Sequence, residues 1–198
     1  MIADATRFEA AIARIDAANA EDPNTEEANG VTHPKELLYG QRMTTWLERL
    51  APDASVALQL AARAQHIRRW SIPRSDYPMN RAGYLKWRSN LNGFHAECAA
   101  DILREVGYDN ATVAAVQSLL RKEHLKRNAD AQCLEDVVCL VFLENYLADF
   151  APQYDERKVL AILRKTWNKM SPKGQATANQ LVLPPLARAL LNKALSAP

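Results

Sequence analysis

Apolar residues recur at steps of three and four positions along almost the whole chain, and no alternating run of strand length stands out. The strongest case is residues 132–150, where the apolar positions cover nearly the full circumference of a helix. We expect this helix to be central and buried. The alternative is a buried strand over residues 137–143, but no second run of that kind exists to pair with it. The pattern therefore predicts an all-α fold.

Capping and turn residues predict where the other helices lie. We expect one from Ile2 that ends near the turn at Asp22, one from Pro34 to Leu50, and one from residue 56, capped by Asp53 or Ser55, to His66. Residues 67–80 are expected to form a loop, because a proline disfavours helix at the residue before it. Further helices are expected over residues 82–106, with Gly107 as the stop, over residues 110–124, capped by Asn110 or Thr112, and over 156–168 and 186–195. Only residues 22–32 have a composition that suggests disorder.

Domain organisation and location follow from composition. We expect a single helical domain over residues 1–198, with a core at about residues 7–150 and a basic C-terminal extension over 151–198. The charges of Asp4, Arg7 and Glu9 argue against a signal peptide, and the longest apolar run is too short to cross a membrane. The three cysteines (Cys98, Cys133 and Cys139) have no CxxC spacing, which favours free thiols in the cytoplasm. The oligomeric state is left open.

Positive charge gathers in the middle of the chain. The net charge is +2, yet residues 63–88 hold seven basic residues against Asp76 alone, which indicates an anionic ligand. The alternative is that these side chains cover helix surfaces or pair with the acidic first 62 residues. With a pI near 8.4 and a patch of modest size, the chain falls below what a dedicated nucleic-acid binder shows. The candidate anion-binding residues are Arg68, Arg69, Arg74, Lys86 and Arg88.

Histidines and one aspartate are the candidate metal ligands. His66, His95 and His124 lie at or inside apolar helical segments, and Asp136 begins the most apolar helix, where a carboxylate is costly to bury alone. Imidazole and carboxylate are ligands that zinc, iron and manganese share, and a helical bundle can bring them together. The alternative is that each histidine packs or caps a helix end and that Asp136 pairs with an arginine.

Several stretches resemble known families. "LQLAARAQHIRRW", "HAECAADILREVGY", "VAAVQSLLRKEHL" and "CLEDVVCLVFLENYLADF" resemble, in order and spacing, the histidine and late-aspartate helices of the HD superfamily of metal-dependent phosphohydrolases. "ELLYGQRMTTWL", "AARAQHIRRWSIPRSDYPMNRAGYLKWRSNL" and "LEDVVCLVFLENYL" are similar to the domain-of-unknown-function 4202 family over about residues 7–170. Two positions depart from the HD pattern. Ile67 replaces the aspartate of the His-Asp pair, and Tyr39 stands where the first histidine would fall, with His33 earlier in the chain.

The HD resemblance implies an HD-like helical bundle that binds a divalent transition metal (zinc, iron or manganese) through His66, His95, His124 and Asp136, with His33 as a weaker candidate. It implies a hydrolase that acts on a small phosphorylated or nucleotide-like substrate. The carboxylates available for proton transfer are Glu97, Glu123 and Glu135. Trp70, Tyr77, Tyr84 and Trp87 could stack on a base, although core packing is the plainer role for each ring. The alternatives are an HD-type iron oxygenase and a non-catalytic helical domain that binds an anion or a partner.

Overall fold

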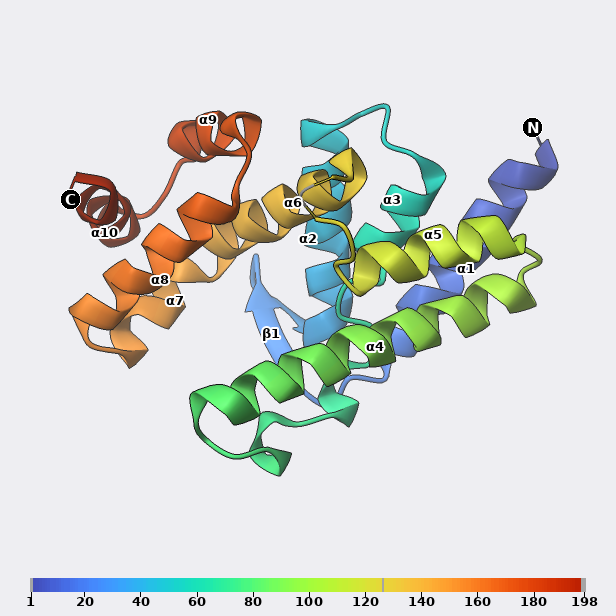
Figure 1. Cartoon of the computed structure of the whole chain (residues 1–198), viewed down its shortest axis with the longest axis horizontal. Helices are drawn as coiled ribbons and strands as arrows, with labels where there is room; N and C mark the ends of the chain where they lie inside the picture. Colours follow the sequence, from blue (N-terminus) through green and yellow to red (C-terminus); the bar gives the residue numbers. More distant parts are fainter. Residues whose placement is uncertain (1, 126, 197–198) are drawn as a thin grey trace.

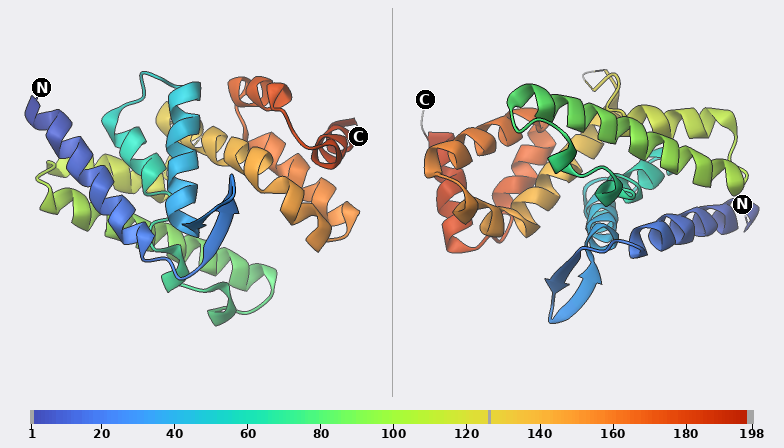
Figure 2. Two further views of the ribbon diagram at one scale, coloured as in Figure 1. Left: turned by 180° about the vertical axis from the view of Figure 1, so that it is seen from behind. Right: turned by 90° about the horizontal axis from the view of Figure 1, so that it is seen from below.

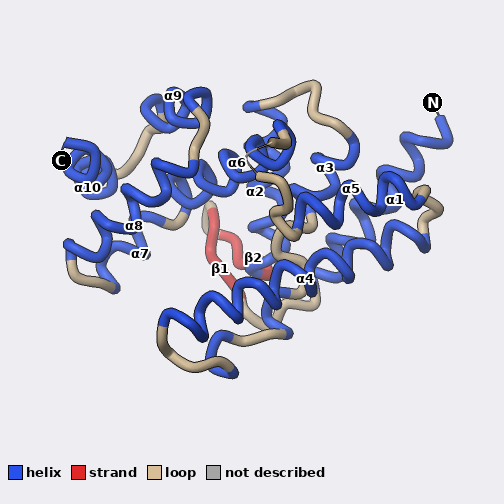
Figure 3. Tube along the Cα trace, viewed as in Figure 1, coloured by secondary structure: helices blue, strands red, loops and turns tan. Residues whose placement is uncertain are grey.

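The computed structural model describes residues 2–125 and 127–196 and confirms the all-α prediction (Figure 1). Figure 3 shows that helices make up nearly all of its regular structure, with one small hairpin beside them. The long helices are α1 (Ile2–Ala20), α2 (Lys35–Leu50), α4 (Arg81–Glu105), α5 (Asn110–Leu120), α6 (Ala129–Asn145), α8 (Glu156–Lys169) and α10 (Pro185–Ser196). The shorter ones are α3 (Val56–Arg63), α7 (Leu147–Phe150), α9 (Pro172–Gln180) and the single turns η1 (Arg69–Ser71), η2 (Arg74–Asp76) and η3 (Ala151–Gln153).

A β-hairpin occupies the segment whose composition suggested disorder. Strands β1 (Thr25–Ala28) and β2 (Val31–Pro34) pair antiparallel, and the turn between them is Asn29-Gly30, both with positive φ. Asn-Gly is the preferred dipeptide for a two-residue hairpin turn, so the sequence did hold this signal. Neither strand alternates apolar and polar residues, so hydrophobic periodicity does not mark them as strands. The hairpin projects from the helices in Figure 2.

The hairpin is anchored to the start of α2. The buried carboxylate of Asp22 accepts hydrogen bonds from the backbone N–H of Glu36, at 3.0 Å, and from Asn24. One of the backbone donors left free at the start of α2 is thus satisfied from a distant part of the chain. This contact fixes the first turn of α2, which contains Glu36 and directly precedes Tyr39.

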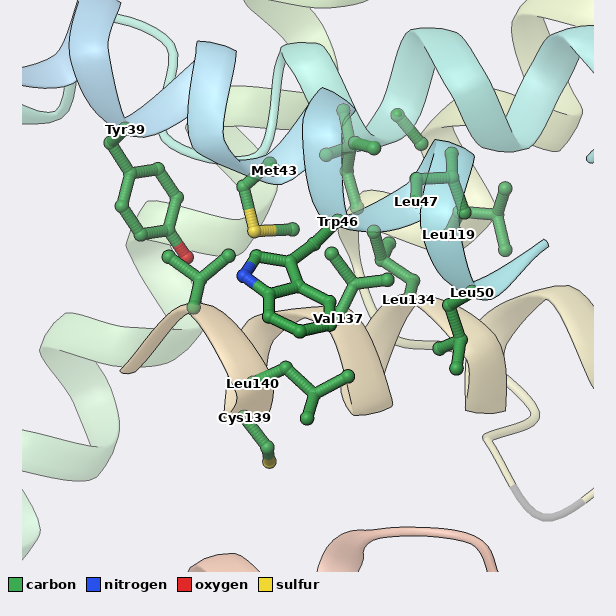
Figure 4. Close-up of a cluster of buried hydrophobic side chains, with 14 of the residues drawn as sticks. Tyr39, Met43, Trp46, Leu47, Leu50, Leu119, Leu134, Val137, Cys139 and Leu140 are labelled. Atoms are coloured by element: carbon green, nitrogen blue, oxygen red, sulfur yellow. The ribbon is translucent and has the colours of Figure 1, made fainter. Parts of the chain in front are cut away.

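The core lies where α2 crosses α6. Figure 4 shows Met43, Trp46 and Leu47 of α2 facing Val137 and Leu140 of α6, and all five side chains are buried. The prediction of a buried central helix is confirmed, although it ends at Asn145 rather than at residue 150. A non-helical backbone at Tyr146 separates α6 from α7.

Helix ends follow the predicted capping residues in part. Ser55 caps α3 and Gly107 ends α4 with φ of +84°, both as expected. The cap of α5 is Asp109 rather than Asn110 or Thr112, and its carboxylate accepts from the N–H of Thr112 at 2.7 Å. Helices α3 and α5 end at Arg63 and Leu120, so His66 and His124 lie on turns beyond them.

The C-terminal helices pack onto α6. Helices α8 and α9 both contact it, and α10 contacts α8 (Figure 1). The proposed division of the chain near residue 150 stays a prediction. The three cysteines are free thiols, as expected. Among the described residues, no helix combines the length and apolarity that a membrane span would need.

Candidate functional site

A cluster of polar and aromatic side chains gathers around His66 from segments far apart in the sequence. Helix α2 contributes its first turn, the segment after α3 contributes His66 and a guanidinium, and α4 passes beside them. The His66 cluster is defined here as Glu36, Tyr39, His66, Arg69, Arg88 and His95.

The imidazole of His66 is held on three sides. Its Nδ1 lies 3.1 Å from Oε2 of Glu36, and its Nε2 lies 2.8 Å from Nη1 of Arg69. The ring stacks on Tyr39, with centroids 3.9 Å apart and planes at 11°. Because a guanidinium can only donate, Nε2 must accept, and the ring proton is on Nδ1 and donated to Glu36. His66 is therefore a neutral imidazole in a defined tautomer.

Arg69 links a carboxylate, an imidazole and an indole. Besides its bond to His66, its Nε lies 3.9 Å from Oε1 of Glu36. Its guanidinium also lies over the ring of Trp87, 5.1 Å from the centroid. The indole N–H of Trp87 donates to the carbonyl of Ile72 at 2.9 Å, which fixes that ring against the loop. Arg69 is thus placed by both α2 and α4.

His95 is the most deeply buried member of the cluster. Its Nδ1 donates to the backbone carbonyl of Ile67 at 2.8 Å, and its ring centroid is 6.0 Å from that of His66. Its Nε2 is buried and has no hydrogen-bond partner among the described residues. Where the HD pattern has an aspartate, this chain has a buried isoleucine that offers only its carbonyl.

Burial controls the protonation of the cluster. It lowers the pKa of His95 to about 3, with His66 and Arg69 acting in the same direction. Burial also holds the pKa of His66 well below its usual value, aided by the charges of Arg69 and Arg88. The pKa of Glu36 is raised by burial, which outweighs the attraction of Arg69. Both imidazoles are therefore neutral at pH 7.

Two further cations act on His66: Arg88, which is a member of the cluster, and Lys122, which is not. Arg88, half-buried on α4, lowers the pKa of His66, Arg69 and Lys122 behind the larger effect of burial on each. Lys122 donates to the buried carboxylate of Glu135 over 2.5 Å. Arg88, in contrast, has no ion pair or hydrogen bond among the described residues.

The structure brings together only two of the predicted metal ligands, His66 and His95. Asp136 lies in another part of the core, where it accepts hydrogen bonds from the N–H and hydroxyl of Ser171 and from Gln132. His124 is exposed on the turn after α5 with φ of +55°, and His33 lies in β2 opposite Glu26. Within residues 2–125 and 127–196, no group of three or more His, Cys, Asp or Glu side chains is arranged to hold a metal ion.

The three glutamates considered for proton transfer also lie apart. Glu97 is exposed and accepts from Arg121 and Gln117. Glu123 is exposed on the turn after α5. Glu135 is buried, but two lysines neutralise it, since Lys169 lies 3.4 Å from its other oxygen. None of the three contacts His66 or His95 in a described hydrogen bond.

Some cations of the basic segment hold the loop or pair with carboxylates, and others lie in the His66 cluster, where they can contact a ligand. Arg74 donates to the carbonyls of Tyr77, Pro78 and Asn80 and so holds the loop together. Arg68 pairs with Glu21 at 3.0 Å at the surface. Lys86 is exposed on α4. Of the five predicted anion-binding residues, only Arg69 and Arg88 belong to the His66 cluster.

Sequence reasoning missed Glu36 as a site residue. The signal was its position, because Glu36 continues the buried stripe of α2 that runs through Tyr39 and Met43. A carboxylate on an apolar stripe must find a donor or a cation when it is buried.

Two surface grooves, of about 450 and 500 Å³, lie away from the cluster, and the second is lined in part by Asp136.

Comparison with known protein families gives a match over most of the chain. A family model described as a domain of unknown function (DUF4202) matches residues 9–191. No curated protein and no solved structure matches the chain. The comparisons lend no support to the HD resemblance.

Proposed function

The chain belongs to the DUF4202 family, a domain of unknown function, and from this premise we propose that it binds a small phosphate-containing anion at the His66 cluster. The observation that carries the proposal is the half-buried guanidinium of Arg88, which has no carboxylate partner among the described residues. The charge of Arg88 lowers the pKa of Arg69, and the charge of Arg69 is only partly balanced by a carboxyl group at 3.9 Å.

The charges around the cluster favour an anion. Glu36 faces Arg69, and Glu135 is already paired with Lys122 and Lys169. The two imidazoles add no negative charge because both are neutral. One guanidinium therefore stays uncompensated in a partly desolvated setting, where its attraction for an anion is stronger than in water. Guanidinium groups also match the oxygen geometry of phosphate.

Metal-assisted hydrolysis is not part of this proposal, because the residues as placed do not fit a shared metal ion. Nε2 of His66 already accepts from Arg69, and Asp136 is engaged by Ser171. The same placement argues against the iron-oxygenase alternative. The function supported best is the binding alternative, and a cytoplasmic setting stays part of the proposal, supported by three free thiols.

The test is the affinity of the purified protein for inorganic phosphate and for sulfate, measured by titration calorimetry with and without a chelator. We expect both anions to bind in the presence of chelator. The variant Arg88→Ala should weaken binding by roughly tenfold, which is the loss of one charge-assisted contact.

Lys86→Ala is the matched control, since it removes an exposed positive charge two residues away on the same helix. It should change the affinity by less than about twofold, because exposed charges are screened. Wild-type protein that binds neither anion, or an Arg88→Ala variant that binds both as tightly as wild type, would contradict the proposal.

A further inference from the structure

An exposed apolar surface adjoins the His66 cluster. Met79, Tyr84 and Leu85 are 81%, 47% and 56% exposed, and they lie within seven residues of one another around the start of α4. Single exposed apolar side chains are ordinary on protein surfaces, whereas a group of them beside a polar site indicates a binding surface. We call these three residues the Tyr84 surface.

The backbone beneath the Tyr84 surface is firmly held. Asn80 caps α4 by accepting from the N–H of Gly83 at 2.8 Å. A Cβ at Gly83 would lie 2.1 Å from the carbonyl oxygen of Pro78, so the loop approaches the helix as closely as a glycine allows. Arg74 bonds the carbonyls of the same loop. A ligand that contacts Tyr84 would therefore meet a preformed surface.

The Tyr84 surface is continuous with the cations of the cluster. The ring centroids of Tyr84 and Trp87 lie 5.9 Å apart. The guanidinium of Arg69 lies 5.1 Å from the same Trp87 centroid, so Trp87 contacts both. Tyr84 and Arg88 are four residues apart on α4, so they lie on the same helix face. Figure 1 shows this first part of α4 extending beyond α5, which covers the later part of the helix.

Tyr84 is the accessible ring among the four aromatic candidates. Trp87 is buried and its indole N–H is engaged by Ile72. The hydroxyl of Tyr77 accepts from Asn90. Trp70 is half-buried on η1. Only Tyr84 combines an exposed ring with a position one helical turn from Arg88.

We propose that the anion bound at the His66 cluster is the phosphate of an ester whose other half is a planar aromatic ring, and that this ring lies on Tyr84. This inference rests on the proposed function, because Arg69 and Arg88 bind the phosphate. Aromatic rings in offset or tilted contact attract one another beyond the effect of the area they bury. Tyr84 is thus a specificity-determining residue, and Leu85 extends the surface on which the ring lies.

The test compares methyl phosphate with phenyl phosphate, which share a phosphate and differ in the esterified group. Wild-type protein should bind phenyl phosphate about tenfold more tightly than methyl phosphate. Tyr84→Ala should abolish that difference and leave methyl phosphate binding unchanged. Tyr84→Phe should keep the difference, since the ring is retained.

Tyr154→Ala is the matched control, because Tyr154 is a similarly exposed tyrosine on another part of the surface. It should bind both esters as wild type does. A nucleoside monophosphate as a third probe distinguishes a nucleobase from a simple aryl group. With either aromatic probe, binding that is tighter than that of methyl phosphate, and that loses this advantage in Tyr84→Ala, supports the inference.

The two ways of failing are distinct. Equal affinity of wild-type protein for methyl and aromatic phosphates would overturn the aromatic-ester inference and leave the anion site intact. A gain that survives in Tyr84→Ala would overturn it too. Loss of binding for every phosphate, inorganic phosphate included, would instead overturn the proposed function itself.

Discussion

Arg69 donates to Nε2 of His66 over 2.8 Å, so a guanidinium occupies the ring nitrogen through which His66 could otherwise reach a ligand. The opposite nitrogen donates to Glu36. The three side chains form a connected set in which the buried carboxylate and the neutral ring each have a partner, while the guanidinium of Arg69 keeps further N–H donors. Their arrangement explains how Glu36 is tolerated on the apolar stripe of α2.

The first prediction concerns this set. Arg69→Ala leaves the buried Glu36 carboxylate without its facing guanidinium, and we expect a loss of about 3 kcal/mol in the free energy of unfolding. Adding Glu36→Gln should recover part of that loss, with a coupling energy of roughly 1–3 kcal/mol in a double-mutant cycle. Urea unfolding of wild type, the two single variants and the double variant measures this coupling energy.

The control Arg68→Ala breaks only an exposed pair and should cost less than about 1 kcal/mol. Strictly additive effects would refute the coupling.

The second prediction concerns pH. The pKa of His95 is about 3 in the folded protein, against about 6.5 in an unfolded chain. The folded value is the lower one, so the stabilising contribution of neutral His95 is complete above pH 6.5 and is lost as the pH falls toward 3. Between pH 7 and pH 5 this single group should cost about 2 kcal/mol of stability.

The measurement is the free energy of unfolding of wild type and His95→Gln at both pH values. The variant should lose about 2 kcal/mol less than wild type over this interval, whatever its stability at pH 7. His124→Gln, a change at an exposed side chain, should keep the wild-type slope. Equal slopes for wild type and His95→Gln would mean that His95 does not become a buried neutral ring on folding.

The third prediction assigns Asp136 to the attachment of the C-terminal helices. Its carboxylate accepts from the N–H of Ser171 at 2.7 Å and from the Ser171 hydroxyl, and Ser171 caps α9. Asp136→Ala should lower the free energy of unfolding by about 3 kcal/mol, because two part-buried donors of Ser171 lose a charged acceptor. Asp149→Ala, at an exposed carboxylate, should be within about 0.5 kcal/mol of wild type. Phosphate affinity, measured well below the melting temperature, should be unchanged in both variants.

The fourth prediction contrasts two glycines in helices. A Cβ at Gly174 of α9 would lie 2.7 Å from Cγ of Asp136, whereas one at Gly93 of α4 would have no atom within 4 Å. Gly174→Ala should therefore destabilise the protein by about 1–3 kcal/mol through overpacking. Gly93→Ala should stabilise it by about 0.5–1 kcal/mol, because alanine favours the helix. Thermal unfolding of the two variants checks the opposite signs.

The positions of most helices could be predicted because helical periodicity and capping are local properties of the chain. Ser55 and Gly107 mark helix ends through bonds to their own neighbours, and α4 and α8 lie within a residue of their predicted bounds. The hairpin was missed because each strand is only four residues long.

The candidate site could be predicted only in part, because its geometry depends on how helices cross. The basic segment and the two histidines were visible in the sequence, yet spacing along the chain does not reveal which distant side chains will meet. Thirty residues separate Glu36 from His66, and thirty-five separate Asp136 from Ser171. Lys122 pairs with Glu135, whereas Arg88 has no ion pair within residues 2–125 and 127–196; the two look alike in sequence, and only packing distinguishes them.

The sequence by itself determined that this chain is helical, where its central helix lies and where positive charge is concentrated, since these follow from residue type and local spacing. The tertiary structure alone decided that Arg69, rather than a further ligand residue, meets His66, and that Asp136 binds the cap of α9. The physical reason is that a buried polar group takes whichever partner the packing of the apolar faces brings within reach.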